Sequence, residues 1–343
     1  MRVLVTGGRG LLGSAVVGEL AGRGHQVTVF QRTSAGHGPD VREVLGDVTD
    51  RVGVGEAMAG QEAVVHLAAL VSMTGPWEGF ERVNVVGTEN VLAAAVGAGV
   101  RAFVQVSSPS VAHAGEPLVG APATAADPEH ARGHYARSKA LAERAALAMD
   151  RDGFAVVAVR PHLVWGPGDT QLIGRIAERA HAGRLALIDE GAALIDSTYV
   201  DNAAEAIAQA LERCQNPDVH GRAFVVSNGE PRTVFELVGR IAMAAGAEPP
   251  NRRVPFPVAR RAGALVERAW AMSGRTDEPP LTAFVAEQLA TAHWFDQRET
   301  RRALAWVPRV GIDEGLERLA RALGGSIRSG GRGAPTIWPS PGL

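Results

Sequence analysis

Cysteine, lysine and tyrosine are the residue types that this sequence uses least. Cys214 is the single cysteine among 343 residues, which excludes an internal disulfide and any metal site built from several cysteines. One thiol is ordinary for a protein of a reducing compartment, so we expect a cytoplasmic location. With 5% aromatic residues and a net charge of −2, the chain also lacks the excess positive charge and the many stacking rings that favour nucleic-acid binding.

Long uncharged apolar runs are absent as well. The most hydrophobic candidate, residues 254–272, is interrupted by Arg260, Arg261, Glu267 and Arg268, so we expect no transmembrane segment. Its spacing instead predicts an amphipathic helix whose apolar face packs on the protein core, with a lipid surface as the alternative. The N-terminal residues enter an apolar strand pattern directly, and we therefore expect no cleaved signal peptide.

What the sequence does contain is an alternation of strand and helix patterns through its first half. Apolar, β-branched runs typical of buried strands occur at residues 3–6, 25–30, 63–67, 101–106 and 155–159. Helical spacing occurs between or after them, at residues 11–23, 81–98 and 135–151. This alternation predicts an α/β fold with a doubly wound parallel sheet of the Rossmann type, covered by helices on both faces.

A glycine-rich segment, TGGRGLLG, joins the first predicted strand to the first predicted helix. Gly7, Gly10 and Gly13 would let the backbone turn tightly and approach a pyrophosphate at the N-terminus of that helix. A glycine-rich segment is often only a turn, but here the strand before it and the helix after it match dinucleotide-binding folds. We therefore expect a dinucleotide cofactor.

The residues that follow the second strand distinguish NADP from NAD. An NAD site places a carboxylate there to bind the ribose hydroxyls. This sequence has Gln31 and Arg32 instead, and Arg9 in the glycine segment adds a second guanidinium. Two planar cations suit a 2′-phosphate, so NADPH is the expected cofactor and NAD the less favoured one, unless Arg32 is an ordinary surface arginine. Asp47, after the third strand, is expected to bind the adenine amine or else to form a turn.

Lys139 is the only lysine among 35 lysine and arginine residues, and it follows Tyr135, one of two tyrosines, by four positions. On a helix this spacing places both side chains on one face. A free phenol has a pKa of about 10, and a fixed ammonium lowers it by stabilising the phenolate. Lysine supplies a compact charge that can also bind a ribose hydroxyl. The pair predicts a proton-donating tyrosine that is tuned by the lysine.

Ser107 and Ser108 end the predicted strand at residues 101–106. The carboxyl edge of a parallel sheet is where open α/β folds bind their ligands. We expect Ser108, with Ser107 as the less favoured alternative, to polarise a substrate carbonyl. Two serines at a strand end are common, so this assignment depends on their partnership with Tyr135 and Lys139. His113, His134 and His162 lie near the expected site and are interpreted as packing or loop residues.

The alternation weakens after residue 165, where glycine and proline become more frequent. A strand is predicted at residues 222–227, and helices at residues 200–213, 233–245, 258–272, 281–292 and 313–322. We expect a dinucleotide-binding domain, a smaller C-terminal substrate-binding lobe and a weakly ordered tail. The expected limits are residues 1–165 with 200–229 for the domain, 166–199 with 230–323 for the lobe, and 324–343 for the tail.

Several motifs together resemble the extended short-chain dehydrogenase/reductase superfamily over about residues 1–320: TGGRGLLG, GDVTD, VVHLAA, NVVGTENVL, SS followed by YARSK, and RPHLVWGPGD. The resemblance implies an NAD(P)-dependent oxidoreductase whose catalytic set is Ser108, Tyr135 and Lys139. It also implies a set of residues that line the cofactor: Gly7, Arg9, Gly10, Leu11, Leu12, Gly13, Gln31, Arg32, Asp47, Val48, Leu67, Ala68, Ala69, Asn84, Tyr135, Lys139 and Pro161.

Two absences narrow the resemblance. Sugar-nucleotide dehydratases carry an acidic pair after the catalytic hydroxyl, whereas Pro109 and Ser110 follow Ser108 here. Nucleotide-sugar enzymes usually carry an arginine before an aspartate where this sequence has Ile195 before Asp196, and an apolar residue cannot hold a diphosphate. The stretch GAALIDSTYVDN, with PPLTAFVAEQLATAHWFD and VPRVGIDEGLERL, instead resembles the 3β-hydroxysteroid dehydrogenase branch.

Within that branch, WGPGDTQLIGRIAERAHAGRL and DSTYVDNAAEAI are most similar to the 2-alkyl-3-oxoalkanoate reductases of long-chain olefin biosynthesis. Those enzymes use NADPH to reduce a β-keto acid with two alkyl chains to the 3-hydroxy acid. The steroid enzymes typically keep an acid after strand two and oxidise with NAD, and this sequence departs from them there. The resemblance therefore implies a β-keto acid reductase of lipid metabolism.

Two alternatives stay open: an NAD(P)-dependent 3β-hydroxysteroid or sterol dehydrogenase, and a non-catalytic NADP-sensing protein. The intact serine, tyrosine and lysine set argues against the second. We expect an apolar small molecule as the substrate and neither a nucleic acid nor a metal as a partner. A peripheral membrane contact, a multi-enzyme contact and a homodimer are left open, the last by analogy alone.

Overall fold

Seven parallel strands form the larger sheet of the molecule, in the order β12-β7-β5-β4-β1-β2-β3. The structure is a computed structural model that describes residues 1–72, 74–113, 115–273 and 279–324. Strands β4, β5 and β7 are buried along their whole length, as expected for central strands covered on both faces. The strand bounds are β1 (Arg2–Thr6), β2 (Gln26–Gln31), β3 (Arg42–Leu45), β4 (Ala63–His66), β5 (Ala102–Val106), β7 (Ala155–Pro161) and β12 (Arg222–Val226).

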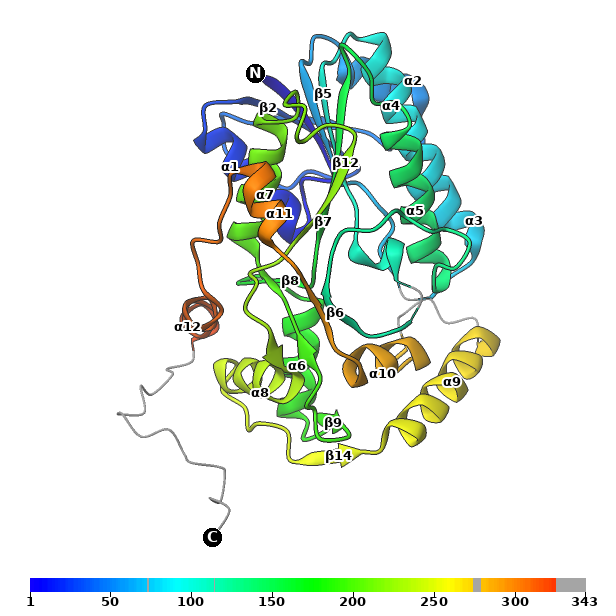
Figure 1. The fold of residues 1–343 in the computed structure, drawn as a ribbon, viewed down its shortest axis with the longest axis vertical. Coiled ribbons are helices and arrows are strands. Elements are labelled where there is room, and N and C mark those ends of the chain that lie inside the picture. Colours follow the sequence, from blue (N-terminus) through cyan, green and yellow to red (C-terminus); the bar gives the residue numbers. More distant parts are fainter. Residues whose placement is uncertain (73, 114, 274–278, 325–343) are drawn as a thin grey trace.

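Successive side chains of these strands enter two hydrophobic clusters on opposite faces. Val3 and Val5 of β1 pack with α1 and α7, whereas Leu4 packs with α2, α4 and α5. The two groups of helices lie on opposite sides of the sheet in Figure 1, which confirms the predicted doubly wound Rossmann-type fold. Their bounds are α1 (Leu11–Gly22), α7 (Val200–Glu212), α2 (Arg51–Met58), α4 (Gly87–Gly97) and α5 (Gly133–Leu147).

A smaller lobe lies beyond the carboxyl ends of these strands (Figure 1). It contains a four-stranded sheet in the order β13-β10-β15-β6 and two strand pairs, β11-β8 and β14-β9. The sheet strands are β6 (Leu118–Ala121), β10 (Leu194–Ile195), β13 (Arg232–Thr233) and β15 (His293–Phe295), and the pairs are β8 (Val164–Trp165), β11 (Thr198–Tyr199), β9 (Ala186–Ile188) and β14 (Arg252–Val254). The helices are α6 (Leu172–His181), α8 (Val234–Ala244), α9 (Phe256–Ser273), α10 (Ala283–Ala290) and α12 (Ile312–Ala322).

Three features depart from the sequence expectations. β6 lies within residues 1–165 but pairs with β15 of the smaller lobe. α11 (Arg298–Leu304), which was expected in that lobe, packs Ala303 and Leu304 into the core of the larger sheet. The helix predicted at residues 81–98 begins as α3 (Trp77–Phe80) and a π-helix (Glu81–Val86) before it continues as α4.

The predicted tail, apart from Gly324, lies outside the described residues. Cys214 is buried and free, in agreement with the expected lack of a disulfide. Among the described residues, no helix is long and apolar enough to cross a membrane. The described part of the chain also holds no cluster of three or more histidine, cysteine or acidic residues that could bind a metal ion.

Candidate active site

The loop between β1 and α1 depends on glycine at several positions. Gly7 has φ +76°, and a Cβ there would lie 2.8 Å from the backbone nitrogen of Ala68. A Cβ on Gly13 would collide with the carbonyl oxygen of Gly7. Gly10 caps α1 without a side-chain bond and has open space around its Cα. The backbone N–H groups at this helix start therefore fit the pyrophosphate of a dinucleotide, which is the arrangement that the glycine spacing predicts.

Two arginines lie together where β2 ends. Arg9 Nη1 donates to Thr33 Oγ1 at 3.0 Å, which brings its guanidinium beside the residue that follows Arg32. Arg32 is exposed and makes no hydrogen bond or ion pair with the residues that the structure describes. Gln31 is buried, and its amide donates to Glu43 at 3.4 Å. Both guanidiniums are thus available at the edge where the adenosine ribose of a dinucleotide would lie.

Glu43 of β3 is an acid at this edge that the sequence pattern did not reveal. Its carboxylate accepts a hydrogen bond from the Ser34 hydroxyl and backbone bonds from Ala35 and His37 at 3.2 and 3.3 Å. These bonds, with that of Ser34 the strongest, hold the pKa of Glu43 below its ordinary value. Because the loop after β2 occupies this carboxylate, it does not offer the ribose contact that the acid of an NAD site makes.

Asp47 and Val48 follow β3 and lie close to the π-helix. Asp47 Oδ1 accepts from the backbone of Thr49 at 2.9 Å, which is the turn-forming role that the sequence left open. Val48 is buried, and its carbonyl accepts from Asn90 of α4 at 3.1 Å. A Cβ on Gly87 would lie 2.8 Å from the Val48 side chain, so this segment is tightly held. An adenine contact of Asp47 stays a prediction.

Asn84 lies in the π-helix and connects the loop after β4 to α5. Its Oδ1 accepts from the Leu70 backbone at 2.6 Å, and its Nδ2 donates to the Leu70 carbonyl at 3.0 Å and to Ser138 Oγ at 2.9 Å. Both amide hydrogens are therefore used within the protein, and Asn84 ties the loop after β4 to α5 at Ser138, one residue before Lys139. π-Helical turns often occur at functional sites.

The remaining predicted cofactor residues lie at the same carboxyl edge of the sheet. Thr6, the last residue of β1, accepts backbone bonds from Leu67 at 3.1 Å and, through its hydroxyl, from Ala68 at 3.2 Å. The loop after β4 is therefore fixed against the glycine loop. Four partly buried side chains and one buried ring line these segments: Leu11, Leu12, Leu67, Ala69 and Pro161.

The structure brings Ser108, Tyr135 and Lys139 together at the carboxyl end of β5. The Ser108 hydroxyl lies near that of Tyr135 and acts to lower its pKa, and Ser108 Oγ lies 2.9 Å from Ser110 Oγ. Lys139 Nζ donates to the carbonyl of Val106, the last residue of β5, at 2.6 Å. Tyr135 and Lys139 stand one turn apart on α5 and therefore face the same strand end. The predicted grouping of the three side chains is present.

Burial controls the acidity of this set. It raises the pKa of Tyr135 to about 12, and the nearby Ser108 hydroxyl only partly opposes that effect. It lowers the pKa of Lys139 to about 8, against an opposing effect of the Glu143 carboxylate. The expectation that the ammonium lowers the tyrosine pKa is therefore not met in this structure. The physical reason is that Lys139 is itself desolvated and donates to Val106, so burial dominates the pKa of Tyr135.

Glu143 and Arg160 form a buried ion pair beside Lys139, which the sequence pattern did not reveal. Arg160, near the end of β7, donates through Nε to Glu143 Oε2 at 2.9 Å and through Nη2 to Oε1. Its Nη1 donates to the Thr124 carbonyl at 2.7 Å. Both side chains are fully buried, so the pair locks α5 to β7. The four-residue spacing from Lys139 to Glu143 was the signal available in the sequence.

His66 is a second buried group that sequence reasoning missed. Its Nδ1 lies 2.7 Å from Thr6 Oγ1 and its Nε2 lies 3.0 Å from Thr88 Oγ1. Burial lowers the pKa of His66 to about 3, and the nearby Lys139 ammonium adds to that effect. A neutral imidazole thus links the ends of β1 and β4 to α4 directly behind the glycine loop.

Ser107 and the three nearby histidines take no part in this grouping. Ser107 donates its backbone N–H to Val159 at 2.7 Å, and its hydroxyl has no hydrogen-bond partner among the described residues. The His162 ring packs against those of His293 and Phe295, with centroids 5.1 and 5.0 Å away. His134 packs against Trp77 and Phe80, and His113 is buried. These are the packing and loop positions that the sequence suggested.

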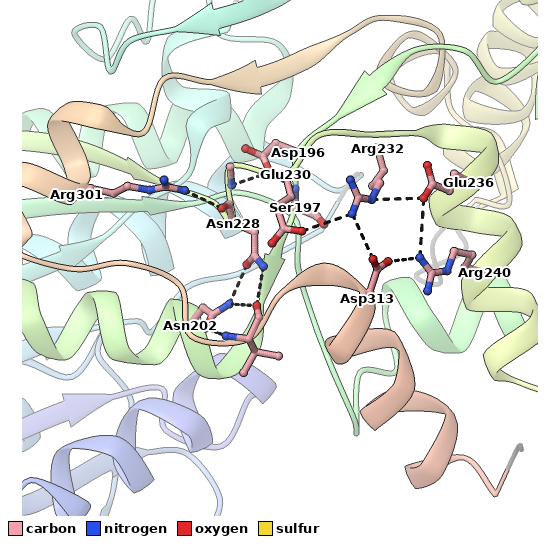
Figure 2. A network of polar contacts seen from close by, with 12 residues as sticks. Asp196, Ser197, Asn202, Asn228, Glu230, Arg232, Glu236, Arg240, Arg301 and Asp313 are labelled. Carbon is pink, nitrogen blue, oxygen red and sulfur yellow. Dashed lines mark hydrogen bonds and ion pairs between the residues drawn. The ribbon is translucent and has the colours of Figure 1, made fainter. Parts of the chain in front are cut away.

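Asp196 lies in the segment in which the sequence differs from that of nucleotide-sugar enzymes. It is part of the polar network in Figure 2. It is buried and accepts from Ser227 Oγ at 2.5 Å and from the backbone of Ser197, Gly229 and Glu230 at 3.0 to 3.3 Å. Ile195 before it is buried in a hydrophobic cluster. The Asp196 carboxylate therefore binds the donors of the turn after β12. Ile195 is apolar and offers no cation that could bind a diphosphate.

Comparisons with known proteins agree with this fold and site. Residues 3–227 match the model of the NAD dependent epimerase/dehydratase family, and the chain therefore belongs to that family. Together with the closely related reductases described next, this makes the chain an NAD(P)-dependent oxidoreductase of the extended short-chain dehydrogenase/reductase type. The resemblance stated from the motifs is confirmed at this level.

Among curated relatives, the chain is 42% identical to a 2-alkyl-3-oxoalkanoate reductase of Stenotrophomonas maltophilia, over 93% of this chain and 98% of that protein. It is 35% identical to a reductase of the same name from Shewanella oneidensis, over 93% and 85%. A 3-beta-hydroxysteroid dehydrogenase of Mycolicibacterium neoaurum is 30% identical over 92% and 89%. The structure of a dTDP-glucose 4,6-dehydratase from Streptomyces venezuelae with NAD bound superposes with a TM-score of 0.72, at 26% identity over 94% and 96%.

Proposed function

We propose that the chain reduces the ketone of a long-chain 2-alkyl-3-oxo acid to the 3-hydroxy acid with NADPH. The observation that carries this proposal is the grouping of the Ser108 and Tyr135 hydroxyls beside Lys139, at the strand ends next to the glycine loop. Hydroxyl donors at this edge are suited to a carbonyl that becomes an alkoxide. The family assignment supports an NAD(P) cofactor, which open α/β folds bind at this edge of the sheet.

The protein side chains have distinct tasks in this reaction. The bound nicotinamide supplies a hydride to the carbonyl carbon. The Ser108 hydroxyl donates a hydrogen bond to the carbonyl oxygen and stabilises the charge that develops there. Tyr135, whose raised pKa keeps it protonated at neutral pH, donates its proton to that oxygen. Lys139 would bind the ribose of the cofactor, and its positive charge lies behind Tyr135. The Val106 carbonyl fixes the position of the Lys139 ammonium.

The preference for NADPH is part of the proposal. It is supported by Arg9 and Arg32 at the end of β2 and by the occupation of Glu43 by its own loop. The arginines offer paired donors to a 2′-phosphate, and no free carboxylate of the described residues next to β2 competes for the ribose hydroxyls. NADH is expected to bind less tightly because it lacks the phosphate that those guanidiniums would contact.

The substrate class is proposed from the reductase relatives and from one local feature. Ile195, buried where nucleotide-sugar enzymes usually hold an arginine, gives no group to bind a diphosphate. A ketone with an apolar body agrees with that feature. The 42% identical relative carries the name of a 2-alkyl-3-oxoalkanoate reductase, and a place in long-chain olefin biosynthesis follows as part of the same proposal. We also propose a cytoplasmic location, supported by the free, buried Cys214.

A panel of substrates and cofactors tests the proposal. The purified chain is mixed with a 2-alkyl-3-oxo acid and NADPH or NADH in a reductive assay, or with a 3β-hydroxysteroid and NADP or NAD in an oxidative assay, and nicotinamide absorbance is followed. We expect turnover of the oxo acid with NADPH. Faster turnover of the steroid would instead favour the dehydrogenase alternative, to which the 30% identical relative points. Tight NADPH binding without turnover of either compound would favour a non-catalytic protein.

A further inference from the structure

The outward face of α9 carries a stripe of large apolar side chains. Val258, Leu265 and Met272 are 54%, 64% and 84% exposed, so their side chains are surrounded mainly by solvent. They are seven residues apart and therefore lie along one line of the helix. An ordinary surface helix turns this kind of stripe toward the core. Here the stripe points away from the protein.

The opposite face of α9 packs on α10 through small residues. Ala259 is buried, and a Cβ on Gly263 would lie only 2.5 Å from the backbone of Thr282 just before α10. This close approach fixes the rotation of α9 about its axis and keeps the apolar stripe outward. Figure 1 shows α9 in yellow at the outer edge of the smaller lobe. The core packing that the sequence favoured for this helix therefore holds for this inner face, where Phe256 also packs against the cluster around Ala259, and not for the outward stripe.

Cations flank the stripe at matching positions. Arg261 and Arg268 each follow an apolar stripe residue by three positions, and both are exposed without a partner among the described residues. The single acid of α9, Glu267, accepts from the backbone of Ala283 at 3.1 Å and so faces α10. The outward face thus combines apolar and positive groups and carries no negative charge. Pairing with the same face of a second copy would place arginines against arginines.

We propose that α9 docks the protein on an anionic lipid surface. The apolar side chains of Val258, Leu265 and Met272 enter the boundary between headgroups and acyl chains, and Arg261 and Arg268 bind the lipid phosphates. The helix lies in the plane of the surface and does not cross it, which agrees with its 18 residues and its interrupting charges. This inference goes beyond the proposed function and does not depend on it.

Vesicle sedimentation tests the proposal with the full chain. Wild type is mixed with vesicles of phosphatidylglycerol and phosphatidylcholine, or of phosphatidylcholine alone, and bound protein is quantified. We expect the anionic vesicles to bind roughly thirty-fold better, the effect of two arginines near a charged surface. The double variants Leu265→Glu/Met272→Glu and Arg261→Gln/Arg268→Gln should each lose this preference. The matched control is Val52→Glu, an exposed valine of α2 far from the stripe in sequence, which should bind as wild type does.

Circular dichroism and the thermal midpoint of each variant show that the fold is kept, since the altered side chains are exposed. Equal binding of wild type to both kinds of vesicle would overturn the proposal, and so would undiminished binding of either double variant. Analytical ultracentrifugation supplies a further independent outcome. If Leu265→Glu/Met272→Glu converts a dimer to a monomer, the stripe is a face for a second copy and the lipid assignment is wrong.

Discussion

At the scale of single residues, the hydroxyl of Tyr135 is the proton donor of the proposed reaction. We predict that Tyr135→Phe lowers kcat by about a hundred-fold to ten-thousand-fold, the usual contribution of a positioned acid. Binding of NADPH should be nearly unchanged, because the substitution removes a proton donor and leaves the ring in place. Steady-state kinetics and NADPH fluorescence measure the two effects.

The matched control is Tyr199→Phe, the other tyrosine of the chain, whose ring packs against Trp165 with centroids 5.5 Å apart. It should keep the wild-type kcat. A Tyr135→Phe enzyme that turns over at the wild-type rate would show that another group donates the proton.

Arg32 permits an equally local prediction about the cofactor. Arg32→Asp replaces an exposed guanidinium by the acid that NAD sites use, so we expect the ratio of kcat/KM for NADPH over NADH to fall at least ten-fold. Kinetics with both cofactors measure this ratio. Arg51→Asp, at an exposed arginine in the first turn of α2, is the control and should leave the ratio as it is. An unchanged ratio in Arg32→Asp would remove the proposed 2′-phosphate contact.

At the scale of secondary-structure elements, the Glu143–Arg160 pair joins α5, the helix that carries Tyr135 and Lys139, to the sheet. Glu143→Gln leaves the Arg160 charge buried without its partner, and we expect a loss of about 3–5 kcal/mol in the free energy of unfolding. Urea unfolding monitored by circular dichroism measures it. Double substitution of Glu143 and Arg160 by Met should recover part of the loss, since no unpaired charge then remains. A loss in Glu143→Gln below about 1 kcal/mol would contradict the buried pair.

The same pair has an expected effect on the pH profile. Glu143 opposes the lowering of the Lys139 pKa, which stands at about 8, so its removal should lower that pKa further. If turnover needs the charged lysine, the alkaline limb of kcat/KM begins near pH 8 in wild type and moves to lower pH in Glu143→Gln. Rates from pH 6 to pH 10 measure the shift. An alkaline limb at the wild-type position would show that Glu143 acts only on stability.

Elements with long, regular patterns were predictable from the sequence, and short elements were not. The predictions for α1, α5, α7 and α8 hold because their apolar residues repeat over three or more turns. Strands of two to four residues, such as β8, β10 and β13, are too short to show a period, and their pairing partners are distant in sequence. The grouping of Ser108, Tyr135 and Lys139 could be predicted because Lys139 and Tyr135 stand out by scarcity and spacing, and their catalytic roles stay a proposal. His66, Glu43 and Arg160 could not, since their roles arise only when separate strands come together.

At the scale of the whole molecule, the network around Asp196 connects the larger sheet to the smaller lobe (Figure 2). Asp196 follows β10 and receives donors from the turn after β12, where Asn228 also accepts from Asn202 of α7 at 3.0 Å. Asn202 and Asn228 both donate to the Val310 carbonyl, which precedes α12. The turn after β12 therefore binds elements of the larger sheet and of the smaller lobe. Substitutions that remove its hydrogen bonds should lower the stability of the whole molecule and not only that of one loop.

Substitutions of Asp196 separate its hydrogen bonds from its charge. Asp196→Ala leaves four donors without their acceptor, two of them buried, and we expect it to lower the free energy of unfolding by about 3 kcal/mol. Asp196→Asn keeps an oxygen for the three backbone donors, and its amide can donate to Ser227. Because burial raises the pKa of Asp196, the ionised carboxylate is disfavoured in the folded state, so Asn should be tolerated at neutral pH.

The sign of the pH dependence follows from the same shift. As the pH falls through the raised pKa, folded Asp196 takes up a proton before the unfolded chain does, so this group makes wild type more stable toward acid. The Asn variant lacks that response. The stability of Asp196→Asn relative to wild type should therefore be highest at pH 7 and decline toward acid, as measured by urea unfolding at several pH values. A relative stability that rises toward acid would mean that the carboxylate is favoured by its donors, and that charge, not geometry, holds the two parts of the molecule together.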